Sequence, residues 1–223
     1  MKRIAFAVLG VVLMLAASVP ASANDSPQVL GFETMTAVTG PFVGKFFPER
    51  TVPGGQLAWI IKSGEGELHA DGTIEVHVRG LVLAKTGTNP IGHFRALVSC
   101  LDIDGNVVNR STGLFRANTR GNSNIHGRIS GLPDPCFAPI VFVTSPTGSW
   151  FAVHGTSLEF DTMVGNHGVF IGPGPSIQGV PPAGAPWKVT RSAEGSLDEG
   201  NLEVAVRGLI IPPLGFNPVD HFR

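Results

Sequence analysis

The 223-residue sequence contains no tyrosine, only two cysteines and few charged residues, since Asp, Glu, Lys and Arg together make up 15% of it. The formal net charge of −1 gives no basic excess, which argues against nucleic acid as a partner. A disordered chain would have fewer apolar residues than the 43% found here. Gly (29 residues) and Pro (18 residues) are too frequent for a coiled coil. These features together favour a turn-rich, mostly β protein.

The first 23 residues have the pattern of an export signal. Lys2 and Arg3 precede an apolar run over residues 4–17, and small residues follow at Ala21 and Ala23. The apolar run is short for a membrane span. We therefore expect cleavage after Ala23, which removes two positive charges and changes the formal charge from −1 to −3. The expected product is secreted, extracellular or in the cell envelope, with no membrane or nucleic acid as partner.

The sequence repeats itself at an offset of 128 residues. Residues 73–81 read TIEVHVRGL and residues 201–209 read NLEVAVRGL. Three further matches have the same offset: 30–35 with 158–163, Trp59 with Trp187, and 89–95 with 217–223. Residues 65–68 match 194–197, where the register slips by one. We interpret this pattern as a tandem duplication and call residues 30–157 repeat 1 and residues 158–223 repeat 2.

Repeat 2 corresponds only to the first half of repeat 1. It has no counterpart of residues 96–157, which contain both cysteines. We expect a complete domain in repeat 1 and an incomplete second copy, as in a C-terminally truncated product of a two-domain gene. The apolar residues of repeat 2 then need cover from repeat 1 or from another chain. Self-association through an open edge of repeat 2 is the expected consequence.

The hydrophobic pattern is that of β-strands. Ile74, Val76 and Val78 alternate with polar residues, which gives a strand with one apolar and one polar face. Further short segments bounded by Gly, Pro, Asn or Asp are expected to be strands: 57–62, 94–101, 113–117, 124–129, 139–144 and 149–153. Asp104-Gly105 predicts a hairpin turn. The expected fold class is all-β, an Ig-like antiparallel β-sandwich.

Cys100 and Cys136 are expected to form one disulfide, because an exported chain with two cysteines meets an oxidising compartment. The C-x-x-C spacing of redox-active pairs is absent. The expected role of the bond is therefore structural.

One sequence motif suggests a binding site. Asn89-Pro90-x-x-His93-Phe94-Arg95 occurs in both repeats, and Arg79 is expected on an adjoining strand. In this interpretation Arg79, Asn89, His93 and Arg95 bind an anion or a sugar. The alternative is that Asn89-Pro90 is a turn and that Arg95 pairs with a carboxylate such as Glu75.

Other signals of catalysis or cofactor binding are weak. The seven histidines form no H-x-H or H-E-x-x-H motif, and no G-x-S-x-G motif occurs, so no catalytic, metal or cofactor residue is assigned. Residues 102–106 (DIDGN) resemble the start of a calcium loop, but a hairpin turn explains them equally and the later ligand positions do not fit. Trp59 and Trp187 either stack on sugars or face the core, which is the commoner arrangement.

Several segments of repeat 1 resemble a known group of proteins. Residues 75–81, 94–101, 111–115 and 132–144 are similar to an uncharacterised family of secreted bacterial, actinobacterial-type β-rich proteins. The resemblance implies export and cysteine pairing and supplies no catalytic residues. We therefore expect a secreted, non-enzymatic β-sandwich module with a structural or binding role. The first alternative is a carbohydrate- or anion-binding domain using Asn89, His93 and Arg95, and the second is a metal-assisted hydrolase.

Overall fold

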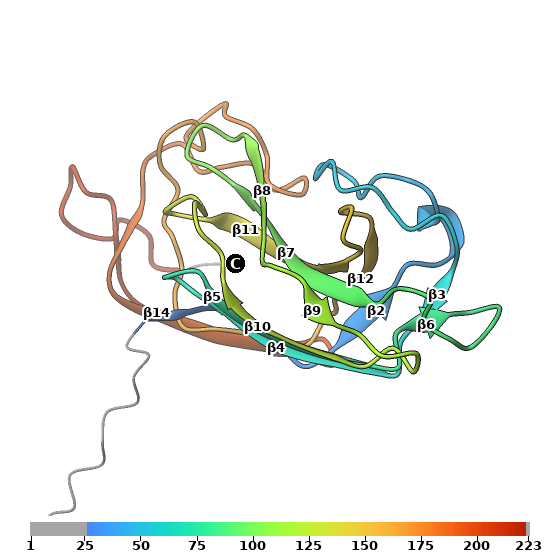
Figure 1. Ribbon diagram of the computed structural model, residues 1–223. Helices are drawn as coiled ribbons and strands as arrows, with labels where there is room; N and C mark the ends of the chain where they lie inside the picture. Colours follow the sequence, from blue (N-terminus) through green and yellow to red (C-terminus); the bar gives the residue numbers. More distant parts are fainter. Residues whose placement is uncertain (1–25, 222–223) are drawn as a thin grey trace, which may run out of the picture.

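The computed structural model describes residues 26–221 (Figure 1). The expected signal peptide at residues 1–23 lies outside this range. Within it, regular secondary structure consists of strands and one short 3-10 helix, η1 (Gly40–Phe42). The expectation of an all-β protein is confirmed, and each of the six segments expected as strands overlaps an observed strand.

The strands form two large antiparallel sheets and one small one. In spatial order, the seven-stranded sheet contains β10 (Ser123–Arg128), β5 (Thr73–Arg79), β4 (Ser63–His69), β1 (Gln28–Phe32), β13 (Leu158–Phe160), β14 (Lys188–Asp198) and β15 (Asn201–Ile210). The six-stranded sheet contains β2 (Met35–Ala37), β12 (Trp150–His154), β11 (Phe137–Thr144), β7 (His93–Leu101) and β8 (Val107–Ser111), with β9 (Phe115–Arg116) paired to β7. The small sheet pairs β3 (Trp59–Ile60) with β6 (Val82–Leu83).

The alternating pattern of β5 places its apolar side chains in the interior. Ile74, Val76 and Val78 are fully buried, whereas the residues between them are half-exposed. Buried side chains from both large sheets belong to one hydrophobic core, and Figure 1 shows the sheets as two layers. Trp59 lies in this core with its ring stacked on Phe151 at 4.1 Å, which confirms the core-facing interpretation for this tryptophan.

The expected hairpin at Asp104-Gly105 is present between β7 and β8. The Asp102 carboxylate accepts hydrogen bonds from the backbone N–H groups of Asp104 and Asn106, at 2.9 and 2.8 Å. These bonds close the turn, so the hairpin interpretation of residues 102–106 is confirmed.

The connections between strands include both hairpins and crossovers from one layer to the other. Here β4 and β5 form a hairpin within one sheet, and β10 returns from the other layer to pair with β5. A return of this kind, in which a strand pairs with one that is distant in sequence, is typical of Greek-key connections.

The two sequence repeats have the same strand order. Repeat 1 pairs β1 with β4 and β4 with β5, and repeat 2 pairs β13 with β14 and β14 with β15. The two units join through β1 and β13, which are matching strands. The strands of repeat 2 therefore continue the sheet of repeat 1.

Candidate functional site

In the expected binding motif, the side chains of Arg79, Asn89 and Arg95 form hydrogen bonds with backbone groups of the protein. Asn89 is only 4% exposed, and its amide nitrogen donates to the carbonyls of Ile91 and Asn118, at 2.7 and 2.9 Å. Its side-chain oxygen accepts from the Ile91 N–H at 2.9 Å. Asn89 thus fixes the loop before β7, as the turn interpretation expected.

Arg79 is not beside the other residues of this motif. His93 and Arg95 lie in β7 of the six-stranded sheet, whereas Arg79 lies in β5 of the seven-stranded sheet. Arg79 donates to the carbonyls of Val78 and Ser123, at 2.8 and 3.1 Å. The expectation that β5 adjoins β7 is therefore wrong, because the chain crosses between layers after Arg79.

Arg95 also has different partners from those expected. Its guanidinium donates to the Ser111 hydroxyl at 3.2 Å and to the Pro146 carbonyl. Glu75 instead contacts two histidines of the seven-stranded sheet, so the expected Arg95–Glu75 pair is wrong. His93 is exposed at the start of β7, opposite Arg116 of β9.

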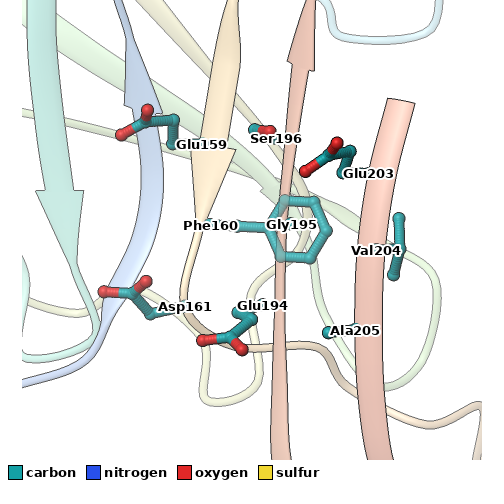
Figure 2. A pocket seen from close by; sticks show the side chains of 9 residues that line it. All are labelled: Glu159, Phe160, Asp161, Glu194, Gly195, Ser196, Glu203, Val204 and Ala205. Carbon is teal, nitrogen blue, oxygen red and sulfur yellow. The ribbon is translucent and has the colours of Figure 1, made fainter. Parts of the chain in front are cut away.

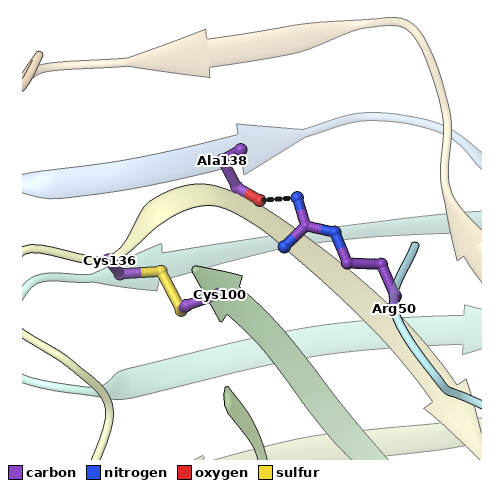
Figure 3. Close-up of a disulfide and its surroundings, with 4 residues drawn as sticks. All are labelled: Arg50, Cys100, Cys136 and Ala138. Carbon is purple, nitrogen blue, oxygen red and sulfur yellow. Dashed lines mark hydrogen bonds between the residues drawn. A yellow bond between two sulfur atoms is a disulfide. The ribbon is translucent and has the colours of Figure 1, made fainter. Parts of the chain in front are cut away.

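The expected disulfide is present, and a buried arginine lies near it (Figure 3). Cys100 at the end of β7 and Cys136 just before β11 are joined with an S–S distance of 1.99 Å. Arg50 is 3% exposed and donates to the Ala138 carbonyl at 2.8 Å. Burial removes water from the guanidinium and lowers the pKa of Arg50 from its usual value. Its burial follows from long-range packing, so no sequence pattern singled it out.

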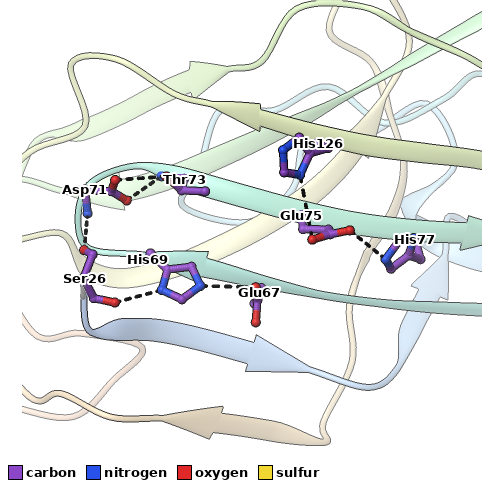
Figure 4. A network of polar contacts seen from close by, with 8 residues as sticks. All are labelled: Ser26, Glu67, His69, Asp71, Thr73, Glu75, His77 and His126. Atoms are coloured by element: carbon purple, nitrogen blue, oxygen red, sulfur yellow. Dashed lines mark hydrogen bonds and ion pairs between the residues drawn. The ribbon is translucent and has the colours of Figure 1, made fainter. Parts of the chain in front are cut away.

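Histidines and carboxylates alternate on the outer face of β4, β5 and β10 (Figure 4). The Glu75 carboxylate lies 3.0 Å from His77 Nε2 and 3.8 Å from His126 Nδ1. His69 lies between the Ser26 carbonyl, at 2.9 Å, and the Glu67 carboxylate, at 3.2 Å. Among residues 26–221 no three side chains are placed to hold a metal ion.

Local contacts and burial also shift the pKa values of His69, Asp71 and His154. Burial opposes a charge on His69, but the Ser26 carbonyl and Glu67 outweigh it and raise the pKa of this histidine. Hydrogen bonds from the Thr73 N–H and hydroxyl lower the pKa of Asp71. His154 is buried against the Phe32 ring, and this burial lowers the pKa of His154.

Carboxylates cross the outer face of the seven-stranded sheet in one row. The strand register aligns, in spatial order, His126, Glu75, Glu67, Gly31, Glu159, Ser196 and Glu203. Two shallow depressions lie along this row, one of about 340 Å³ in repeat 1 and one of about 460 Å³ in repeat 2. Figure 2 shows the second, with the Glu159, Glu194 and Glu203 carboxylates around it. The row gives this face a negative charge.

The opposite face of β13, β14 and β15 is apolar and open. We call it the open face and define it by the apolar side chains that alternate with the outer-face residues and are not buried: Phe160, Leu197, Leu202, Val204 and Val206. Ala193 lies on the same side of β14 but is only 2% exposed. Leu202 is 64% and Val204 45% exposed, whereas the matching residues of repeat 1, Ile74 and Val76, are fully buried. The same type of sheet face is thus covered in one repeat and uncovered in the other.

Comparison with known proteins gives no relative for this chain. No family model, no curated protein and no solved structure matches it. Within residues 26–221 no helix is long and apolar enough to cross a membrane. Functional interpretation therefore depends on the geometry of the sheets.

Proposed function

We propose that the protein is an exported, non-enzymatic β-module with a structural or binding role in the cell envelope or extracellular space. In this proposal it acts through the open face of repeat 2. The observation that carries the proposal is the exposure of Leu202 and Val204 at positions where repeat 1 has buried residues. Exposed contiguous apolar surface of this kind marks an interaction site.

The repeat pattern supports a tandem duplication as the origin of the open face. Repeat 1 would be an Ig-like antiparallel β-sandwich of two layers. Repeat 2 would have kept the inner-face residues of that sandwich, because its strands have the same pairing. The disulfide and the N-terminal sequence pattern are compatible with export.

Binding of an apolar fluorescent dye tests the proposed function. The disulfide-bonded chain, studied at the lowest practical concentration, should bind the dye, and Leu202→Glu with Val204→Glu should lose most of this binding. Ala205→Glu is the matched control, because Ala205 lies between these residues and points to the opposite face. Equal dye binding by all three proteins would contradict the proposal.

A further inference from the structure

Repeat 1 contains a sheet face that corresponds to the open face and is covered by the six-stranded sheet. In repeat 1, the face formed by Phe32, Leu68, Ile74, Val76 and Val78 is buried in the core. The side chains from the opposite sheet in this core include Phe94, Ala96 and Val98 of β7. In repeat 1, this face therefore packs against the apolar face of another β-sheet.

One matching pair of methionines shows the effect of that cover. Met35 is 7% exposed, and its side chain lies over Gly64, within 2.8 Å of the position that a Cβ on this glycine would take. The matching Met163 is 42% exposed, and Ala193 occupies the position that corresponds to Gly64. Ala193 is nevertheless only 2% exposed, so the uncovered apolar side chains of repeat 2 include Met163, Leu202 and Val204.

The open face is also free of charge and continuous with the core. Glu159, Glu194 and Glu203 alternate with the open-face residues and therefore point away from it. The strand pairing of β13 with β1 makes the open face an extension of the inner face of repeat 1. Two such faces can approach each other without placing like charges opposite one another.

We propose that the open face packs against the open face of a second chain across a two-fold axis. This inference rests on the proposed function and names the partner. Each chain supplies a neutral Leu/Val surface, so the contact is self-complementary, as a two-fold interface requires. The dimer interface would be two antiparallel sheets packed face to face, the same type of packing as between the two large sheets.

Molecular mass in solution, measured over a range of concentrations, tests this inference. The disulfide-bonded chain should form a dimer. Leu202→Glu with Val204→Glu should raise the dimer dissociation constant by about 100-fold or more, because the carboxylates would be buried without partners. Ala205→Glu should leave the dissociation constant unchanged. Circular dichroism should show the same strand content in all three proteins, since Leu202 and Val204 are exposed within one chain.

A second measurement does not depend on tolerance of a buried charge. Val204→Cys should give a covalent dimer with a short bifunctional thiol reagent, and Ala205→Cys should not. A monomer at every concentration would overturn the inference, and so would a dimer that the paired Glu substitutions leave intact. A monomer that still binds the apolar dye through Leu202 and Val204 would overturn this inference and leave the proposed function standing. A monomer whose dye binding is unaffected by these substitutions would remove both.

Discussion

Gly31 and Glu159, which occupy the same position in the two repeats, face each other in the neighbouring antiparallel strands β1 and β13. The next pair joins Phe32 with Leu158, which matches Leu30. Backbone bonds run from Glu33 N–H to the Ser157 carbonyl, at 3.3 Å, and from Asp161 N–H to the Gln28 carbonyl, at 3.0 Å. The β1–β13 contact is therefore centred on equivalent positions of the two repeats, and the bond to Gln28 lies one residue away from the symmetric position at Val29.

The first prediction concerns this pairing. A Cβ on Gly31 would lie 3.5 Å from the Glu159 Cβ, which is within disulfide range. Gly31→Cys with Glu159→Cys should therefore oxidise to a second intramolecular disulfide, with the flexible end of the Gln28 side chain moving aside. Mass spectrometry after alkylation under denaturing conditions measures the free thiols.

The control for this pair is Gly31→Cys with Glu203→Cys. Glu203 lies on the same face but three strands from Gly31, roughly 14 Å away at the usual strand spacing. It should keep both thiols free. If the control pair oxidised as readily as the first pair, the β1–β13 register would be wrong.

The second prediction compares two glycines at the same position of the repeats. A Cβ on Gly66 would lie 2.8 Å from the Phe32 ring and 2.3 Å from the Glu75 carbonyl. Phe32 is fixed in the core, so Gly66→Ala should lower the free energy of unfolding by about 1–3 kcal/mol.

Gly195→Ala is the matched variant, because its Cβ would meet the Phe160 ring and the Glu203 carbonyl of β15, each at 2.6 Å. Phe160 lies on the open face and β15 is an edge strand, so both can move, and the loss should stay below about 1 kcal/mol. Urea denaturation measures both variants. A loss for Gly195→Ala as large as that for Gly66→Ala would contradict the prediction that the face of repeat 2 is less covered.

The third prediction concerns the Cys100–Cys136 bond. The bond closes a loop with a sequence separation of 36, which restricts the unfolded chain. Replacing both cysteines by alanine should therefore lower the free energy of unfolding by about 3–4 kcal/mol. Chemical denaturation of the double variant and of the disulfide-bonded protein provides the comparison, and indistinguishable midpoints would contradict the prediction.

The fourth prediction is a pH dependence of stability. Burial lowers the pKa of His154 in the folded protein, so the unfolded chain takes up the proton more readily. The contribution of His154 to stability is therefore lost as the pH falls below its ordinary pKa of about 6.5. His154→Gln should reduce this loss, as measured by urea denaturation between about pH 5 and 8.

His69 provides the opposite case. Its pKa is raised in the folded protein, so its stabilising contribution is complete below about pH 6.5 and is lost as the pH rises through the raised value. His69→Gln should therefore cost more stability at the acidic end of the range than at the alkaline end. Parallel pH profiles for the two variants would show that neither histidine titrates as described.

The accuracy of the sequence predictions depends on how far apart the interacting residues lie. The alternation of Ile74, Val76 and Val78 predicted a strand with one buried face, because that pattern is local. The partner of Arg95 was predicted wrongly, because it depends on the layer in which each strand lies. Arg50 escaped notice for the same reason, since residues far away in sequence bury it.

The sequence by itself determined the all-β class, the repeated strand pattern and the choice of Cys100 and Cys136 as partners, since no other cysteine exists. Only the tertiary structure decided that β1 pairs with β13, and that the apolar side chains of β15 lie on a face left open in residues 26–221. The physical reason is that the alternation of side chains depends only on the residues of one strand. Which strand pairs with a given strand edge depends instead on all the other strand edges of the chain.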